Sequence, residues 1–313
     1  MRYDHVLSEV LRWPWAIQPE ALSLLAEILG RRIAGRPFTD AELEARLAAG
    51  QARAAARGNG ARIGTVAVLP ILGMLLPRAE AMETSGAVST QALTARFDAL
   101  VNDPAVAAIV LDVDSAGGSV GGIAEFADRV QAARTTKPVV ALANPMMASA
   151  AYWIGSAARD LLVTPSALIG SIGVYTAHAD MSQALAKEGI AVTLINAGAK
   201  KVLGNEFEPL SAEGRTELQQ RVDEFYALFV AAVARGRGVS QKAVREGFGQ
   251  GGVVGAEAAI ALGMADRMGT LDDAVALAAK RAGVTLADVP APSVLADADE
   301  AARYRLALAD REL

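Results

Sequence analysis

Short apolar runs alternate with amphipathic stretches between about residue 62 and residue 285. Short apolar runs without polar alternation are typical of strands buried on both faces of a largely parallel sheet. They occur at residues 63–73, 106–115, 137–144, 160–165, 169–176 and 190–198. Helical periodicity lies between them, at residues 88–101, at 120–134, from 150 onward, and in a long helix with Leu218, Val222, Phe225, Phe229 and Val233 on its buried stripe. Strands that alternate with helices predict the α/β class.

The two ends of the chain have a different texture. Residues 1–60 predict a helical N-terminal segment, with Leu22, Leu25, Leu29 and Ile33 on one face and a linker at "AARGNG". Residues 286–313 form an acidic, Ala/Pro-rich tail. The organisation expected is therefore a central domain over residues 61–285 between two peripheral segments.

The amino-acid composition excludes several kinds of functional site. The 313 residues are 52% hydrophobic, enough for a substantial core, and carry 30 basic against 35 acidic side chains without a basic stripe, so nothing predicts nucleic-acid binding. Cysteine is absent, which excludes disulfides and thiolate nucleophiles, and two histidines are too few for a histidine-rich metal site. Two uncharged runs, 138–158 and 161–179, reach membrane-spanning length, but Pro, Asn and Gly interrupt them and favour buried sheet and helix.

A glycine-rich turn follows the strand at 106–115 in the stretch "DSAGGSVGG". Glycines between a buried strand and a helix leave backbone N–H groups accessible to an anion or a developing oxyanion. A phosphate-binding loop is the rival interpretation, but its lysine is absent and the dinucleotide glycine spacing does not fit. An ordinary glycine turn also stays open.

Ser149 lies between the next strand and the next helix, in "NPMMASAAYWIGSAAR". Serine is a favoured N-cap, so an ordinary cap is the simplest interpretation. However, a parallel sheet would bring Ser149 beside Gly117 and Gly118 at its carboxyl edge, where sites usually lie. A nucleophile beside two amide donors is the minimum apparatus for acyl transfer.

A base is the remaining requirement. His178 has no clear carboxylate partner in its sequence neighbourhood and is expected to be a loop histidine. A neutral lysine can do the same work, and burial in an apolar pocket lowers a lysine pKa. Lys200 and Lys201 follow an apolar run, although most lysines are solvated surface groups.

These ordered motifs together resemble the signal peptide peptidase A family of serine–lysine peptidases, which share the ClpP/crotonase fold, a repeated β-β-α arrangement. The branch encoded by tailed phages as head maturation (prohead) proteases is the most similar. The resemblance runs from about Gly64 to Ala274. "VAAIVLDVDSAGGSVGG" is similar to the family's strand and glycine turn, with Ala116 in place of a proline, and "MASAAYWIGSAA" is similar to its nucleophile helix, with Ser149 as the serine.

The rest of the site follows from the same resemblance. "LIGSIGVY" is similar to the segment that holds a lysine-orienting serine, here Ser171, and the G-x-x-K motif places Lys201 as the base and Lys200 as its exposed neighbour. The oxyanion would be held by backbone amides of Gly117, Gly118 and Ala150. A segment from 229 to 275 is similar to the family's closing helix and glycine–aspartate signature.

The resemblance implies a serine endopeptidase with a Ser–Lys dyad that forms an acyl-enzyme and needs no metal or organic cofactor. It also implies a capsid or scaffold protein as substrate, a homo-oligomer, no membrane span, and a location in the host cytoplasm inside the phage procapsid. Three alternatives stay open: a bacterial signal peptide peptidase that degrades leader peptides, a crotonase-like acyl-CoA enzyme, and a catalytically inactive capsid-associated structural protein.

Overall fold

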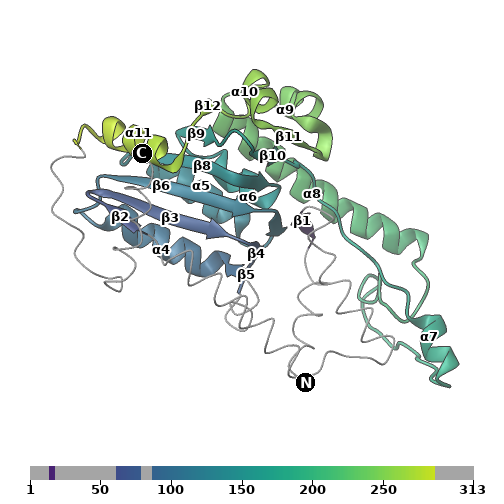
Figure 1. Cartoon of the computed structure of the whole chain (residues 1–313). Coiled ribbons are helices and arrows are strands. Elements are labelled where there is room, and N and C mark those ends of the chain that lie inside the picture. The colour runs from purple at the N-terminus through teal and green to yellow at the C-terminus, as the bar shows by residue number, and fades with distance from the viewer. Residues whose placement is uncertain (1–13, 18–60, 79–86, 286–313) are drawn as a thin grey trace.

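A computed structural model describes residues 14–17, 61–78 and 87–285 of the chain. The helices predicted before residue 60 and the tail after residue 285 lie outside these residues. The main element of the described part is an eight-stranded sheet, with the path β11-β10-β8-β6-β3-β2 and with β9 and β12 attached beside β8 (Figure 1). Its strands are β2 (Ala61–Ile63), β3 (Val66–Leu72), β6 (Ala108–Ser115), β8 (Val139–Ala148), β9 (Asp160–Val163), β10 (Leu168–Gly170), β11 (Val253–Gly255) and β12 (Arg267–Met268).

The inner ladders of this sheet are parallel, and only β2 and β11 at its edges pair antiparallel. The expected α/β class with a largely parallel sheet is therefore confirmed. Parallel strands need covered faces, and both faces are covered here. A smaller sheet has the order β1-β7-β4-β5 and is built from β1 (Trp15–Ile17), β4 (Met74–Leu76), β5 (Ala87–Ser89) and β7 (Gly117–Ser119).

Alternate residues of the central strands point to two separate cores. In β3, Ala67, Leu69 and Ile71 belong to the larger core, which α4, α5, α6 and the second half of α8 cover. Val66 and Val68 belong to the smaller core under α11, on the opposite face. The helices are α4 (Thr90–Asn102), α5 (Ile123–Ala133), α6 (Ala150–Gly155), α7 (Ser182–Lys187), α8 (Ala212–Arg237), α9 (Gln241–Gly247), α10 (Ala256–Ala261) and α11 (Leu271–Ala282).

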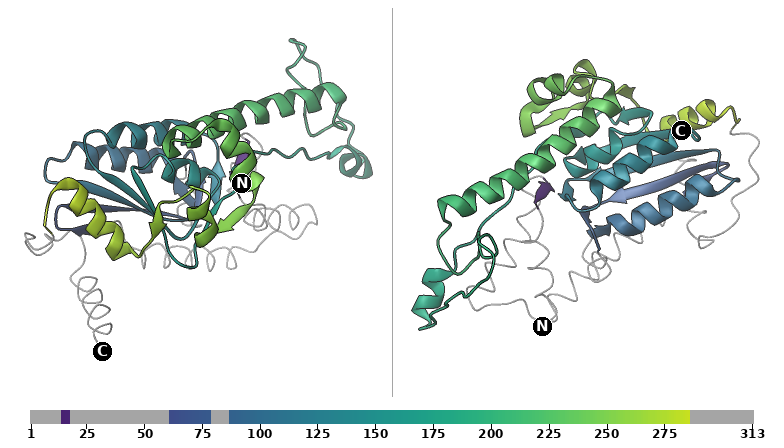
Figure 2. Two further views of the ribbon diagram at one scale, coloured as in Figure 1. Left: turned by 90° about the horizontal axis from the view of Figure 1, so that it is seen from above. Right: turned by 180° about the vertical axis from the view of Figure 1, so that it is seen from behind.

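An arm extends away from the sheets between about residue 176 and residue 211, and the first half of α8 extends with it (Figures 1 and 2). The strand predicted at 190–198 is wrong: this stretch has no strand partner, and Ile190, Val192 and Ile195 are exposed. The predicted stripe of α8 is only half right. Phe229 and Val233 are buried, whereas the stripe positions nearer the arm are only half-buried because no layer covers them.

Candidate active site

Ser149 occupies a sharp turn between β8 and α6. Its backbone has φ 56° and ψ −120°, a conformation that a residue with a side chain rarely adopts, and its side chain makes no capping hydrogen bond. Ser149 lies at the expected N-cap position without acting as a side-chain cap. A strained serine between a strand and a helix is the arrangement of a nucleophile elbow, which presents the serine oxygen at the edge of a sheet.

The turn is fixed by its neighbours. The Ser149 N–H donates to the Gly170 carbonyl at 2.7 Å, and the Ser149 carbonyl accepts from the Trp153 N–H at 2.9 Å. The residue is 1% exposed, so the isolated chain keeps this serine covered.

The glycine turn lies directly against Ser149, as its position after a neighbouring strand predicts. Gly117 has φ +99°, and a Cβ on it would lie 2.9 Å from Ser149 Cβ and 3.0 Å from the Ala148 carbonyl oxygen. A Cβ on Gly118 would lie 1.9 Å from the Leu75 carbonyl oxygen. Real Cβ contacts are not this short, so both positions require glycine.

The amides of this turn differ in what they bond. The Gly117 N–H donates to Ser115 Oγ at 3.1 Å, and Ser115 Oγ in turn donates to the Gly73 carbonyl at 2.6 Å. Of the three amides expected at an oxyanion site, Gly117 therefore has an intramolecular partner of its own. Gly118 instead lies opposite Ala16 of β1, an extended segment, so its amide is the better candidate from this turn, together with Ala150 at the first position of α6.

Ser171 follows the strand beside Ser149. In the parallel ladder between β10 and β8, Gly170 pairs with Ala148, so the two serines come one residue after the same rung. Ser171 has φ 53°, is 5% exposed, and donates its N–H to the Gly252 carbonyl at 2.7 Å. The structure thus brings together Ser149, Ser171 and the glycine turn.

Lys201 is not part of this cluster in the isolated chain. It lies in a turn of the arm and is exposed, with its N–H bonded to the Gly198 carbonyl at 3.0 Å. Its neighbour Lys200 binds Glu217 of α8 at 2.6 Å, and this hydrogen bond raises the pKa of Lys200. Glu217 precedes the buried Phe229 by twelve residues of α8. It therefore lies roughly 18 Å along the helix from the part of α8 that packs on the core.

His178 also lies in the arm, as a loop histidine should. Its Nε2 is 2.7 Å from the Asn205 carbonyl oxygen. It lines a cavity of about 300 Å³ with Pro14, Phe207 and Leu218 among its other walls. Among the described residues, no group of three or more His, Asp or Glu side chains could hold a metal ion.

The helix that begins after Ser149 is held firmly from behind. Trp153 stacks on Phe229 of α8, with ring centroids 4.7 Å apart and planes 6° from parallel. Gly236 of α8 touches the end of α6, where a Cβ would lie 2.2 Å from the Ser156 carbonyl oxygen. These contacts fix the direction of α6 and hence of the serine turn.

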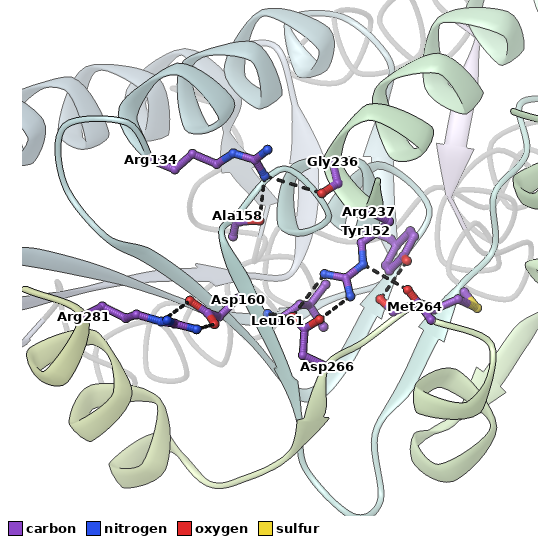
Figure 3. A network of polar contacts seen from close by, with 11 residues as sticks. Arg134, Tyr152, Ala158, Asp160, Leu161, Gly236, Arg237, Met264, Asp266 and Arg281 are labelled. Atoms are coloured by element: carbon purple, nitrogen blue, oxygen red, sulfur yellow. Dashed lines mark hydrogen bonds and ion pairs between the residues drawn. The ribbon is translucent and has the colours of Figure 1, made fainter. Parts of the chain in front are cut away.

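A polar network supports the same helix (Figure 3). The hydroxyl of Tyr152 is fully buried and donates to the Met264 carbonyl at 2.9 Å, and burial raises the pKa of Tyr152. Arg237 reaches Asp266 with Nη2 2.6 Å and Nη1 3.2 Å from its carboxylate oxygens, and the Leu161 N–H donates to Asp266 at 2.7 Å. The network therefore joins α6, α8 and β9.

Sequence reasoning missed one element of the site, the strand β1. Trp15–Ile17 pairs antiparallel with Gly117–Ser119 of the glycine turn. The only signal is the three-residue apolar stretch after a proline in "RWPWAIQPE", which is too short to show a period.

The sequence is similar to known peptidases and phage proteins over part of its length. The family model "Peptidase family S49" matches residues 131–285. The chain is 38% identical over 211 residues to the capsid assembly protease C of Escherichia phage lambda, and 37% identical over 218 residues to the head-tail preconnector protein GP5 of Enterobacteria phage P21. These alignments cover 67% and 69% of this chain but only 48% and 43% of the relatives, so the chain spans less than half of their length.

Among solved structures, a mutant of the 1510-N membrane-bound stomatin-specific protease is similar at 12% identity, with a TM-score of 0.44, over 66% of this chain and 81% of that one. In the described ranges of the present chain, no helix is both long and apolar enough to cross a membrane.

Proposed function

We propose that the chain is a serine endopeptidase that uses Ser149 and Lys201 to cut capsid or scaffold proteins during phage head maturation, on the premise that residues 131–285 match the model of peptidase family S49. The observation that carries the proposal is the strained turn at Ser149, packed against Gly117 at the carboxyl edge of a parallel sheet. Neither residue is explained by packing alone. A cap needs no positive φ, and an ordinary turn needs no glycine beside a serine Cβ.

In the proposed reaction, Ser149 Oγ attacks the scissile carbonyl carbon and Lys201 Nζ accepts the serine proton. The negative charge that develops on the carbonyl oxygen is stabilised by the backbone N–H groups of Gly118 and Ala150. Lys201 then protonates the leaving amine and activates water against the acyl-enzyme. Ser171 follows Gly170, the residue that pairs with Ala148 just before Ser149, and its hydroxyl is proposed to orient the lysine.

Lys201 has to approach Ser149 for this reaction, and the isolated chain holds it on the exposed arm. We propose that the neighbouring copy in a homo-oligomer provides the approach, with the arm of one copy reaching the serine of the next. Exposed apolar side chains on the arm support an interface there, with Ile195 95% exposed. Such a head-to-tail contact can close into a ring.

The substrate and the location are proposed from the relatives. The protein of phage lambda is named a capsid assembly protease, and we propose that the present chain likewise acts on capsid proteins, inside the procapsid. The test is co-expression of the chain with candidate phage capsid and scaffold proteins, followed by mass spectrometry of the products. Cleavage by the wild type and none by Ser149→Ala is the expected result, and equal cleavage by both would overturn the proposal.

A further inference from the structure

Strand β1 has hydrogen-bonding neighbours on both of its edges. On one side, Trp15 exchanges two backbone hydrogen bonds with Tyr175, its N–H donating at 2.7 Å and its carbonyl accepting at 2.9 Å. On the other side, β1 runs antiparallel to β7, with Ala16 opposite Gly118 and Ile17 opposite Gly117. A three-residue strand thus fills a slot between the glycine turn and the segment that follows Ser171.

The slot places one carbonyl at the proposed oxyanion site. Because Trp15 directs its backbone groups to Tyr175, the alternation of an antiparallel ladder directs those of Ala16 to Gly118. A Cβ on Gly117 would lie 2.3 Å from the Ala16 carbonyl oxygen and 2.9 Å from Ser149 Cβ. The Ala16 carbonyl oxygen and Ser149 Cβ are therefore close to each other. The next backbone contact along the strand is the Val120 N–H, which donates to the Pro14 carbonyl at 3.2 Å.

We infer that Pro14–Ile17 occupies the substrate groove of this peptidase and presents the Ala16–Ile17 peptide bond to Ser149. The inference rests on the proposed function and specifies its substrate class: an extended segment, bound by strand addition, with a small residue on the acyl side of the bond and bulky apolar residues beside it. Strand addition uses main-chain hydrogen bonds for affinity and alternate side chains for specificity.

The side chains of β1 support this assignment. Ala16 is fully buried and belongs to the main core, in contact with the site, so nothing larger than a methyl group fits there without rearrangement. Trp15 and Ile17 point to the other face, where they pack with Leu76 and Ala87 and with the half-buried Tyr175. The groove therefore selects a small residue at one position and bulky residues at its neighbours.

The groove also has room for more of a bound chain. The cavity of about 300 Å³ at the base of the arm begins at Pro14, the first described residue of the segment. Figure 1 shows β1 at this end of the sheet, beside the point at which the arm departs. A longer substrate would continue from the position of Pro14 into this cavity.

Cleavage of such a segment has a simple balance. Ser149 Oγ bonds to the carbonyl carbon of the alanine, the bond to the isoleucine nitrogen breaks, and that nitrogen leaves as an amine with the proton taken from Ser149. Water then releases the alanine carboxylate and returns the proton to Ser149. Peptide and water are the only reactants.

The first test uses the wild-type chain and a synthetic peptide that copies residues 12–19, RWPWAIQP. Mass spectrometry should find cleavage between the alanine and the isoleucine, and the matched peptide RWPWRIQP should be cut at least 10-fold more slowly. Cleavage elsewhere in RWPWAIQP, or equal rates for the two peptides, would overturn the inference.

The second test locks the strand in place. The chain contains no cysteine, so Trp15→Cys with Ser119→Cys creates a single possible disulfide between residues that face each other across the β1–β7 ladder. Cleavage of a general substrate such as casein should fall at least 10-fold on oxidation and return on reduction, while each single variant stays insensitive to reductant. Equal casein cleavage by the oxidised and reduced double variant would overturn the inference.

The casein assay also distinguishes a failure of the proposed peptidase function from a failure of the assignment of Pro14–Ile17 to the substrate groove. If wild type and Ser149→Ala show the same background towards casein, the proposed peptidase function fails. If casein cleavage depends on Ser149 but the peptide and the disulfide give the contrary results above, only the assignment of Pro14–Ile17 fails.

Discussion

Ser149 and Ser171 follow the same rung of the sheet: Ala148 pairs with Gly170, and each serine then turns into the positive-φ region, at 56° and 53°. Two adjacent strands therefore end in the same unusual way at the same edge. Each turn is stabilised from outside itself, Ser149 by the Gly170 carbonyl and Ser171 by the Gly252 carbonyl. Substitutions at this edge of the sheet should therefore change peptidase activity in measurable ways.

Gly117→Ala should inactivate the chain. The new methyl group would meet Ser149 Cβ and the Ala16 carbonyl oxygen at distances that atoms do not tolerate, in addition to the strain of φ +99°. We expect casein cleavage to fall at least 100-fold, a loss of about 3 kcal/mol in transition-state stabilisation. Gly189→Ala is the matched control, since its φ of +73° carries similar strain but nothing lies within 4 Å of the new methyl group. Equal losses in both variants would contradict the close contact at Ser149.

Lys201→Ala and Lys200→Ala should separate cleanly. Loss of Lys201 removes the proposed base and should reduce casein cleavage to the level of Ser149→Ala. Loss of Lys200 removes an exposed ion pair with Glu217 and should leave the cleavage rate within about twofold, because such pairs contribute little. The opposite result, an inactive Lys200→Ala beside an active Lys201→Ala, would move the base by one residue. Circular dichroism of both variants checks that the fold is intact.

Mixing two inactive variants tests where the lysine comes from. If Lys201 of one copy serves Ser149 of another, subunits of Ser149→Ala and Lys201→Ala exchanged at equal amounts should regain about a quarter of wild-type activity, as random head-to-tail contacts predict. Sedimentation of the mixture shows whether subunits associate. Association without recovered activity would mean that the arm folds onto its own serine instead.

The ion pair behind α6 predicts a pH dependence of stability. Burial opposes ionisation of Asp266, but the hydrogen bonds from Arg237 and from the Leu161 N–H outweigh it and lower the pKa of Asp266. The carboxylate therefore contributes stability that is present above the unfolded pKa of about 3.9 and is lost as the pH falls through the lower folded pKa. Asp266→Asn should lower the free energy of unfolding at pH 7 by about 1 kcal/mol, a modest value because the side chain is 43% exposed.

Urea unfolding at pH 7 and pH 3 measures this effect, and the difference between wild type and Asp266→Asn should shrink at the lower pH. Asp98→Asn is the control, because its partner Arg129 is half exposed at the surface. A constant difference at both pH values would show that Asp266 acts through packing rather than charge.

The central α/β layers were predictable because their signal is local. The buried strands at 106–115 and 137–144 and the helix at 120–134 are continuous runs of their own type, and the structure has β6, β8 and α5 there. The meeting of Ser149 with Gly117 followed from the topology of a parallel sheet. The backbone strain at Ser149 could not be foreseen, since no residue pattern records a φ angle.

The failures have a common physical origin in partners that are distant along the chain. Residues 190–198 carry the composition of a strand but have no neighbouring strand to pair with, and a strand without a ladder does not form. Trp15–Ile17 shows the reverse case: its sequence signal is minimal, but β7 and Tyr175 provide a ladder on both edges. The presence or absence of a distant pairing partner decided both outcomes.

The positive φ of Ser149 implies a conflict between folding and function at that residue. Glycine adopts this conformation without steric cost, whereas serine gives up about 1 kcal/mol to hold it. Ser149→Gly should therefore yield a more stable but inert protein. Selection for stability alone would favour glycine at position 149. The serine therefore indicates a functional requirement that lowers the stability of the chain.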